Sequence, residues 1–565
     1  MSVARVTHIW RIADQSRAQV RALAEAIGVP PIMAHLMILR GITDPEEARS
    51  FLLPSLSQIS DPFLLTDMDK AVARITLARD RDERVLIFGD YDVDGIAGTA
   101  ILTNAFRRFG LRRVTYAMPQ RQGDGYGLSA DQVEAAWQEG VSLLVTVDNG
   151  ISAYSAAARA RELGMDLIIT DHHATDNGLP DAVAVVNPKR EGPSHPAYNL
   201  CGAGVGFKLA TALNGTPNDL DLVALGTVAD IVPMLGENRA LVFLGLRHLS
   251  KYGRPGLAKL AQSAGVSLQE VTAEQVGFQL APRLNAAGRL DDAMLSLKLL
   301  MEEDPGEADR MAQRLNAANT ERRSIEKQIF EEAVEEVDTW FQPSQRGIVL
   351  AHHAWHIGVI GIVAARIQSR YHRPVVLIAM DEAGWGRGSA RSGPGFDMVG
   401  AFSACQNLLE RFGGHRSAAG LTIREANIPE FREAFESEAL RQLGPGEIIP
   451  ELAIDVLAAF SQIDGALLRA LERLEPVGQG NPSPVFCSMG VELLPQSTRI
   501  LKDRHLKMSL KQGDAVFPAI GFNMAERFYT ESLPRTLDVA YTPQLNSFRG
   551  DTVVQLVLKD IRPAE

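Results

Sequence analysis

The stretch RVLIFGDYDVDGIAG, residues 84–98, decides how the chain folds. Its first half, VLIF, is a short continuous apolar run, which is typical of a strand buried on both faces of a parallel sheet. Three carboxylates follow at alternate positions, on Asp90, Asp92 and Asp94. Like charges this close repel one another strongly unless a cation lies between them. The stretch therefore predicts a divalent-metal site at the carboxyl end of a strand, where open α/β sheets bind their ligands.

Two other interpretations of this stretch are a solvated acidic loop and a calcium loop of the EF-hand type. An EF-hand loop lies between two helices and ends in a Glu at its twelfth position. Here a strand precedes the loop and the residue at that position is not acidic.

Composition limits the class of protein. A length of 565 residues suggests three or four domains, and contents of 46% hydrophobic and 22% charged residues are globular values. The net charge of -12 argues against a protein that coats nucleic acid through bulk charge, but it leaves room for a local basic channel. No apolar run approaches the ~18 residues of a membrane span, and the first residues do not resemble a signal peptide. Cys201, Cys405 and Cys487 are isolated, so the sequence supports neither a disulfide framework nor a zinc finger and favours a reducing cytoplasm.

From about residue 71 short apolar runs alternate with helical patterns. The run SLLVTV stops at Asp148, and the run DLIIT stops at Asp171, His172 and His173. Each of three apolar runs thus ends in side chains that are able to bind a metal. A lone His pair is usually a surface or structural feature, but a doubly wound sheet would bring all these strand ends to one edge.

Two further segments belong to the same region. LVALGTVADIVP places Asp230 after a helical apolar stretch, where a buried capping Asp is the alternative to a metal ligand. CGAGVGFKLA, from Cys201, lacks both the dinucleotide spacing and the Walker lysine followed by Ser or Thr. We assign it to packing at a helix start and predict no ATP site.

These motifs resemble a known family. GDYDVDG, VDNG, TDHH and GTVADIVP are similar, in this order, to the four motifs of the DHH phosphoesterases, and most of all to the RecJ group of bacterial single-strand-specific DNA exonucleases. PRLNAAGR, WHIGVIGIVAARI, GRGSARS, GGHRSAAG and EPVGQGNPSPVF extend the resemblance over nearly the whole chain. Sibling groups that hydrolyse pyrophosphate, short RNAs or cyclic dinucleotides share the core motifs, usually in shorter chains.

The resemblance implies a multi-domain α/β protein. We expect an N-terminal helical segment (1–70), a parallel-sheet DHH catalytic domain (71–235), a helical region with a long linker helix (236–341), a smaller α/β DHHA1 substrate-binding domain (342–445) and an OB-like β-barrel that binds nucleic acid (450–565). Apolar spacing between about 305 and 341 predicts the linker helix, with coiled-coil dimerisation as the alternative.

Oxygen-rich ligands with imidazoles suit two divalent cations, Mn²⁺ or Mg²⁺. By resemblance, the metal ligands are Asp90, Asp92, Asp94, Asp148, His172 and Asp230, and Asp94 also counts among the catalytic residues. His173 would polarise the scissile phosphate or protonate the leaving oxygen, and Asp171 would orient the His pair.

The substrate groups are expected on basic segments. Residues 342–425 carry nine Lys or Arg against five Asp or Glu, with glycines beside them. A solvated basic loop would explain the arginines alone. We expect Arg121, Ser389 and Arg391 to hold a 5′-terminal phosphate, Arg289 to reach the strand backbone, and Gly414, His415 and Arg416 to bind phosphates. In the barrel, we favour a core position over base stacking for Phe517, Phe522, Phe528 and Tyr541.

The predicted activity is metal-dependent degradation of single-stranded DNA from 5′ to 3′ to mononucleotides, in DNA repair and recombination. The rival class is hydrolysis of pyrophosphate, short RNAs or cyclic dinucleotides, and a third interpretation is a degenerate scaffold. By resemblance, the partners are the single-stranded-DNA-binding protein and a RecQ-type helicase, with no membrane contact. We expect a cytoplasmic monomer.

Overall fold

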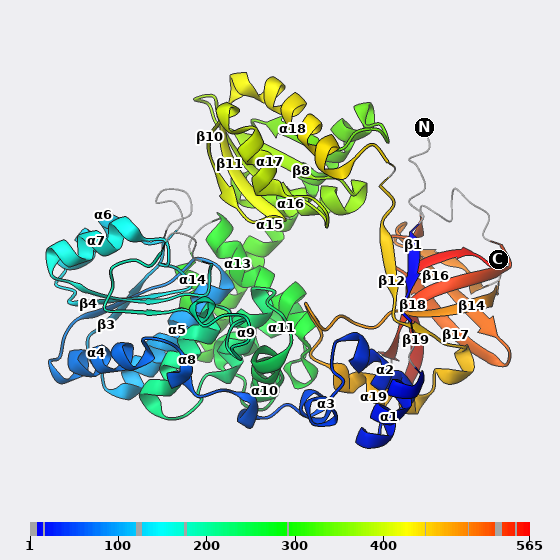
Figure 1. Cartoon of the computed structure of the whole chain (residues 1–565), viewed down its shortest axis with the longest axis horizontal. Helices are drawn as coiled ribbons and strands as arrows, with labels where there is room; N and C mark the ends of the chain where they lie inside the picture. The colour runs from blue at the N-terminus through cyan, green and yellow to red at the C-terminus, as the bar shows by residue number, and fades with distance from the viewer. Residues whose placement is uncertain are drawn as a thin grey trace. The chain divides into compact units, whose positions relative to one another are not determined.

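The computed structural model describes residues 8–14, 17–119, 127–174, 178–290, 293–446, 448–494, 497–525, 534–548 and 551–564. The chain forms two compact units, one built mainly from residues 313–450 and the other mainly from 10–288 and 451–564. The larger unit contains the predicted catalytic sheet and the C-terminal barrel (Figure 1).

The catalytic sheet has five parallel strands in the order β3-β2-β4-β5-β6, which confirms the predicted parallel sheet. The strands are β2 (Val85–Phe88), β3 (Val114–Ala117), β4 (Leu143–Val147), β5 (Asp166–Thr170) and β6 (Ala184–Val186). Every residue of β4 is buried, as expected for a strand that has helices on both sides.

Helices cover both faces of this sheet. Figure 1 shows α6 and α7 on one side and α4, α5 and α8 on the other. Their bounds are α4 (Met68–Asp80), α5 (Val93–Phe109), α6 (Ala130–Gln138), α7 (Tyr154–Leu163), α8 (Gly202–Asn214) and α9 (Leu220–Ala229). Asp92 caps α5 and Ser129 caps α6, so both helices begin where the side chain of the preceding residue accepts backbone N–H groups.

A helical region follows the catalytic sheet. Its elements are α10 (Gly236–Tyr252), α11 (Pro255–Ala264), α12 (Ala273–Gln275), a π-helical segment η5 (Val276–Leu280), α13 (Ala281–Leu290) and α14 (Met294–Met301). The predicted long helix is α15 (Pro305–Trp340), and its buried Ile329, Ala333 and Val337 pack into the core of the smaller unit.

The smaller unit contains a mixed sheet in the order β10-β11-β9-β8-β7. Only β7 and β8 are parallel among its described strands, because helix α16 connects them as a crossover. The elements are β7 (Ile348–His352), α16 (Ile357–Tyr371), β8 (Val375–Met380), β9 (Trp385–Arg391), α17 (Met398–Ala404), β10 (Leu409–Gly414), β11 (Ala418–Arg424) and α18 (Ile428–Leu443).

The C-terminal strands close into a barrel. Strands β14, β18, β19, β17 and β16 are paired in this order, and β14 also pairs with β16, which closes the ring. The β17–β19 pair is parallel, and the other pairs in the ring are antiparallel, as in an OB-fold. The elements are β12 (Glu451–Ile454), β13 (Val456–Leu457), α19 (Gly465–Leu471), β14 (Phe486–Leu493), β15 (Arg499–Leu501), β16 (His505–Gln512), β17 (Ala515–Gly521), β18 (Thr536–Phe548) and β19 (Asp551–Pro563).

The aromatic residues of the barrel divide between core and surface. Tyr541 is fully buried, and Phe517 is partly buried against the same core, as predicted. Phe522 is 54% exposed, so the prediction of a core position is wrong for this residue. Its ring stacks edge-on against His505 on the outside of the barrel. Phe528 lies outside the described residues.

The N-terminal segment contains one strand in addition to the expected helices. β1 (Ile9–Ile12) pairs with β12 beside the barrel (Figure 1). The helices are α1 (Arg17–Ile27), α2 (Pro31–Leu39) and α3 (Pro45–Leu52), and their buried apolar residues share one hydrophobic cluster with the barrel strands. Within the described ranges, no single helix is long and apolar enough to cross a membrane, and α1 with α2 passes that test only as a pair bent by 111°.

Candidate active site

The acidic turn after β2 is held in place by backbone hydrogen bonds. Asp92 accepts the N–H groups of Asp94 and Gly95 at 2.9 and 3.2 Å, and thus caps α5. The backbone has no room for a side chain at Gly95, where a Cβ atom would lie 2.5 Å from the nitrogen of Asp90. From a distant helix, the Oδ1 atom of Asn285 accepts the N–H of Val93 at 3.0 Å.

Asp94 is fixed by the beginning of another helix. Its two carboxylate oxygens accept the N–H groups of Gly202 and Ala203, the first residues of α8, at 2.6 and 2.9 Å. A helix N-terminus stabilises a negative charge in this way. The segment that begins at Cys201, which we assigned to packing at a helix start, therefore also positions a candidate metal ligand.

The end of β4 contributes Asp148 in an unusual backbone conformation. Asp148 has a φ of 64°, a left-handed value that is uncommon outside glycine and is found at strained functional positions. Asn149 secures the turn, because its Nδ2 atom donates to the carbonyl oxygens of Phe88 and Val147 at 3.2 and 3.0 Å. The ends of β2 and β4 are thus tied together.

The end of β5 contributes the His pair, which Asp171 orients. This buried carboxylate accepts the backbone N–H groups of Ile151, His172 and His173 at 2.9, 2.7 and 3.1 Å. It also contacts Nδ1 of the His173 ring at 2.7 Å, so Nε2 of that ring faces away from the carboxylate. Asn187 donates to the carbonyl oxygen of His173 at 2.9 Å.

The strand ends meet around His172. Its Nε2 atom lies 3.1 Å from Oδ1 of Asp148 and 3.8 Å from Oδ2 of Asp94, and its Nδ1 atom lies 3.7 Å from Oδ2 of Asp230. Four residues from four separate segments thus lie side by side, as the sequence predicts.

Three sets of side chains each place their ligand atoms within 4.8 Å of one another, and Asp148 and His172 each belong to two of these sets. They are Asp90, Asp92 and Asp148; Asp94, His172 and Asp230; and Asp148, His172 and His173. All six predicted metal ligands belong to at least one set. His173, for which we predicted a role with the phosphate, also has a ring nitrogen at ligand distance.

The electrostatics of these groups fit bound cations. Burial raises the pKa of Asp90 to about 7, and the negative charge of Asp92 contributes to this increase. Burial and the charge of Asp94 raise the pKa of Asp230 to about 8 and that of Asp148 well above its ordinary value. Oδ1 of Asp90 and Oδ1 of Asp148 are buried without a hydrogen-bond partner among the described residues. Nε2 of His172 lies 3.1 Å from Oδ1 of Asp148 but is not aligned to form a hydrogen bond with it.

The two histidines and Asp171 titrate differently. Burial lowers the pKa of His172, which favours the neutral imidazole that binds metals. Burial would also lower the pKa of His173, but its contact with Asp171 outweighs this and raises the pKa to about 9. Burial alone would raise the pKa of Asp171, yet its hydrogen bond with His173 and the accepted N–H groups keep it below the ordinary value.

The smaller unit brings several predicted substrate residues together. Nη1 of Arg289 donates to the carbonyl oxygen of Gly358 near the start of α16, at 3.0 Å. Gly361 of the same helix lies against Ser389 and Arg391 of β9, and Nη1 of Arg391 lies 3.2 Å from Oγ of Ser389. The structure thus gathers two guanidinium groups and a hydroxyl around the first turns of one helix.

The other predicted substrate residues lie in a hairpin or outside the described residues. Gly414 ends β10 with a φ of 137°, and the N–H of His415 donates to the carbonyl oxygen of Ala418 at 2.8 Å. This N–H is therefore used within the hairpin, whereas the side chains of His415 and Arg416 are exposed. Arg121 lies outside the described residues.

Sequence reasoning missed the neutral groups that position the charged ones. They are Asn149, Asn187, Gly202, Ala203 and Asn285. VDNG and PRLNAAGR drew attention to two of these segments, but no local pattern indicated which carboxylate or turn each group would contact.

Comparison with known proteins places the chain in a family. Family models match residues 84–227 (DHH family, N-terminal domain), 344–440 (DHHA1 domain) and 454–560 (RecJ OB domain). A Bacillus subtilis protein named single-stranded-DNA-specific exonuclease RecJ is 35% identical over 559 residues, which cover 98% of this chain and 71% of the relative. The chain belongs to the RecJ family. The RecJ of Escherichia coli is 34% identical, with coverage of 95% of this chain and 96% of the relative.

Solved RecJ structures have the same fold. The crystal structure of RecJ from Thermus thermophilus in complex with Mn²⁺ matches with a TM-score of 0.85 and 31% identity, over 98% of this chain and 80% of that chain. The complex of the same protein with Mg²⁺ matches with a TM-score of 0.79. These two structures are complexes with divalent cations, and the donor atoms of the site described here suit cations of that kind.

Proposed function

We propose that this RecJ-family chain is a metal-dependent exonuclease that degrades single-stranded DNA. The observation that carries this conclusion is the meeting of three carboxylates, on Asp90, Asp148 and Asp230, with the imidazole of His172. Burial raises the pKa values of the three carboxyl groups and lowers that of His172. Such a group of oxygen and imidazole donors fits two divalent cations, Mn²⁺ or Mg²⁺. A two-cation centre supplies a nucleophile at neutral pH and neutralises the charge that develops on a phosphate.

Six residues would hold the cations: Asp90, Asp92, Asp94, Asp148, His172 and Asp230. The backbone N–H groups at the start of α8 keep Asp94 in place. In the same cluster, one oxygen of Asp90 and one oxygen of Asp148 are buried without a hydrogen-bond partner among the described residues. Asp94 therefore contributes both a ligand atom and the register of α5 against α8.

His173 acts on the phosphodiester itself. With its pKa raised to about 9, the ring is protonated at neutral pH. Asp171 contacts Nδ1 of the ring, and we assign the proton on the opposite nitrogen, Nε2, to the scissile phosphate or the leaving oxygen. Asp171 acts through this ring and is a positioning residue.

The basic group in the smaller unit supports recognition of a 5′ end. A terminal phosphate has more negative charge than an internal diester, and guanidinium groups and a hydroxyl match its oxygens. Arg391 and Ser389, together with Arg121, would provide these contacts. Arg289 would reach the strand backbone, and Gly414, His415 and Arg416 would bind phosphates of the strand. Binding of the 5′ end accounts for digestion from 5′ to 3′ with release of mononucleotides.

The wider role follows from this activity. Single-stranded DNA is the substrate in DNA repair and recombination, and we infer that the chain acts there in the cytoplasm as a monomer. The single-stranded-DNA-binding protein would deliver covered strands, and a RecQ-type helicase would supply unwound ends.

The test compares substrates and one variant. Purified protein with Mn²⁺ receives 3′-labelled single strands, the matching blunt duplex and, in parallel, pyrophosphate and a cyclic dinucleotide. We expect mononucleotides from the single strand alone. Asp148→Asn should lower the rate by more than about a hundredfold, because residues that only support metal ligands already cost up to that factor. The exposed Asp514→Asn serves as the control.

Digestion of the duplex at the same rate as the single strand would contradict the proposed specificity for single strands. Hydrolysis of the small substrates without digestion of DNA would assign the site to the rival class of small-molecule hydrolases.

A further inference from the structure

The end of β6 brings one more charged side chain to the catalytic edge of the sheet. Strand β6 runs parallel to β5, and the short turn η3 (Pro188–Arg190) follows it directly. Residues that follow parallel strands reach the same edge of a sheet. Asn187 ties this turn to the His pair, because its Oδ1 atom accepts the N–H of Lys189 and its Nδ2 atom donates to the carbonyl oxygen of His173, both at 2.9 Å. The backbone of Lys189 is thus fixed relative to His173.

The ammonium group of Lys189 is held by Tyr198. Nζ donates to the carbonyl oxygen of Tyr198 at 2.8 Å and lies 4.0 Å from the centroid of its ring. An ammonium group has three N–H donors. One donor is used by the carbonyl oxygen, and the ring covers another side of the group. At least one donor therefore remains for a ligand, and the side chain is only partly buried.

The charge of Lys189 is not neutralised, in contrast to the charges of other basic groups in this region. Arg190 pairs with Asp67 at 2.8 Å, and the buried Lys208 pairs with Glu237 at 2.8 Å. Among the residues that the structure describes, no carboxylate oxygen lies within 4.0 Å of Nζ of Lys189. Lys189 thus keeps its charge for a partner that the described residues do not supply.

This charge reaches the proposed metal ligands. Burial lowers the pKa of His172, and the positive charge of Lys189 adds to this decrease. Burial raises the pKa of Asp230, and the same positive charge opposes that increase. Lys189 therefore lies close enough to the catalytic centre to act on two of its groups.

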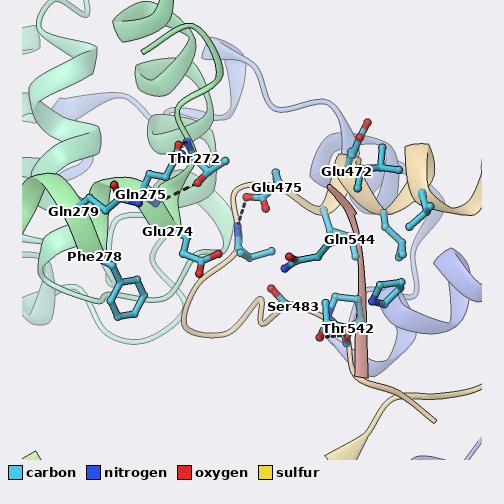
Figure 2. Close-up of a pocket in the computed structure, with 17 residues that line it drawn as sticks. Thr272, Glu274, Gln275, Phe278, Gln279, Glu472, Glu475, Ser483, Thr542 and Gln544 are labelled. Atoms are coloured by element: carbon cyan, nitrogen blue, oxygen red, sulfur yellow. Dashed lines mark hydrogen bonds between the residues drawn. The ribbon is translucent and has the colours of Figure 1, made fainter. Parts of the chain in front are cut away.

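Another concave site of the larger unit provides no such cation. The cleft in Figure 2 has a volume of about 580 Å³, and its wall contains Glu274, Glu472 and Glu475. None of the described residues that line it is Lys or Arg. A phosphate would be repelled there, whereas the catalytic edge offers it the ammonium group of Lys189.

The reaction needs positive charge at the phosphate. Water gives a proton to solvent, and its oxygen forms a bond to phosphorus. The bond between phosphorus and O3′ breaks, and O3′ keeps the electron pair and takes the proton of His173. The diester carries one negative charge, whereas the new terminal phosphate carries about 1.5 to 2 at neutral pH. A group that responds to this increase stabilises the transition state more than the substrate.

We propose that Lys189 is a catalytic residue whose ammonium group binds a non-bridging oxygen of the scissile phosphate and stabilises the charge that develops there. Tyr198 is a positioning residue, because it holds the ammonium group through its carbonyl oxygen and ring. The inference deepens the proposed function and rests on it, since it takes the phosphodiester in the catalytic site as the ligand.

The first test uses Mg²⁺ alone and needs no activity. Isothermal titration calorimetry compares the wild type with Lys189→Met. Removal of a positive charge beside the centre should make Mg²⁺ bind about threefold more tightly, because the cations are repelled less. A lysine that only anchored the segment before α8 would have the opposite effect, since Gly202 in that helix holds Asp94. Its loss would then weaken Mg²⁺ binding.

The second test measures turnover of single strands at saturating Mn²⁺. Lys189→Met should lower kcat about a hundredfold, as for the loss of one donor to a developing oxyanion, and leave KM within about twofold. Lys251→Met is the matched control, because Nζ of Lys251 also lies over a tyrosine ring, 4.9 Å from the centroid of Tyr252. Lys251 is exposed near the end of α10, a helix about 25 Å long that begins after Asp230.

A third variant tests the charge itself. Lys189→Cys introduces a partly exposed thiol, whereas the natural Cys201, Cys405 and Cys487 are free and buried. Alkylation with 2-bromoethylamine forms a thioether that ends in an ammonium group, and this should raise kcat at least about tenfold above that of the unmodified variant. Iodoacetamide adds a neutral amide instead and should not restore kcat. The wild type receives both reagents as the control.

The outcomes separate this inference from the proposed function. Weaker Mg²⁺ binding by Lys189→Met, an unchanged kcat, or equal recovery with the two reagents would each overturn the role of Lys189. A wild type that binds Mg²⁺ but digests no single strand contradicts the proposed function. In that case the direction of the change in Mg²⁺ affinity still tests whether the ammonium group lies beside the cations.

Discussion

At the scale of single residues, the aspartates of this site differ in what surrounds each carboxylate. Asp171 accepts three backbone N–H groups and contacts the His173 ring, so it is stable as an anion without any metal. Asp90 and Asp148 are buried beside other carboxylates, and each has an unpartnered oxygen among the described residues. The same residue type, aspartate, thus positions a neighbouring group at one site and is suited to bind a cation at another, depending on what surrounds its carboxylate.

Gly361 determines how closely α16 approaches the two groups proposed to bind the 5′ phosphate. A Cβ atom there would lie 2.8 Å from Oγ of Ser389 and 3.2 Å from Nη2 of Arg391. Gly361→Ala must therefore displace both groups from the helix. We expect kcat/KM for 5′-phosphorylated single strands to fall about tenfold, the loss for about one charge-assisted hydrogen bond, with a smaller effect on 5′-hydroxyl strands. Kinetics with the two kinds of end measure this ratio.

The control for this prediction is Gly446→Ala, because no atom lies within 4 Å of the corresponding Cβ position in the same unit. It should leave the preference for a 5′ phosphate unchanged. If Gly361→Ala lowers the rate on both kinds of end by the same factor, the displacement acts on general folding and the proposed phosphate pocket loses its support.

At the scale of secondary-structure elements, the sequence was sufficient to predict the edge where the site lies. Strands β2, β4 and β5 are buried on both faces and therefore appear as continuous apolar runs, and in parallel strands the residues after each run reach the same edge. The closeness of Asp94, Asp148 and His172 was predictable for this reason. Asp230 follows helix α9 instead of a strand, and only the family resemblance assigned it to the site.

The contacts that position these strand ends were not predictable. Gly202 reaches Asp94 from 108 positions away in the sequence, and Asn285 reaches Val93 from 192 positions away. Both are neutral groups at the start or in the middle of a helix, where local patterns indicate only packing. The π-helical turn at η5 was missed as well, because its sequence VGFQL carries no signal that separates it from an α-helix.

Because these strand ends crowd carboxylates together, the stability of the metal-free protein should depend on pH. A carboxyl group whose pKa is raised on folding stabilises the fold while it is protonated, and this contribution is lost as pH rises through the folded value. For Asp90 and Asp230 the folded values are about 7 and about 8. His173, with its pKa raised to about 9, acts in the same direction. We expect Tm in EDTA to fall between about pH 6 and about pH 8.5.

Divalent cations should reverse this trend, because they offset the repulsion among ionised carboxylates. The increase of Tm on addition of Mg²⁺ should therefore be larger at the upper end of this pH range than at its lower end. Differential scanning calorimetry with and without Mg²⁺ provides the measurement. If the plots of Tm against pH with and without Mg²⁺ run parallel across this range, the carboxylate cluster does not titrate with the predicted sign.

At the scale of the whole molecule, the N-terminal segment is part of the C-terminal barrel body. Local patterns suggested a helical segment of its own, since they contain no information about partners more than 400 residues away. In the structure, Nε2 of His35 lies 2.8 Å from the carbonyl oxygen of Asp455, and Arg40 donates to Oδ1 of Asn481 at 2.7 Å. The buried face of α2 lies in the same hydrophobic cluster as the barrel strands.

Helix α2 allows a matched test of this arrangement. Leu36 is fully buried in the shared cluster, whereas Leu39 of the same helix is 39% exposed. Leu36→Ala removes buried methyl groups and leaves a cavity, which typically costs about 2–5 kcal/mol. Leu39→Ala has the same change in helix propensity, so it controls for effects on α2 itself. Hydrogen exchange followed by mass spectrometry should show faster exchange in peptides from β14 and β18 for Leu36→Ala only. Faster exchange confined to α1–α3, with the barrel strands unchanged, would mean that the N-terminal segment does not support the barrel.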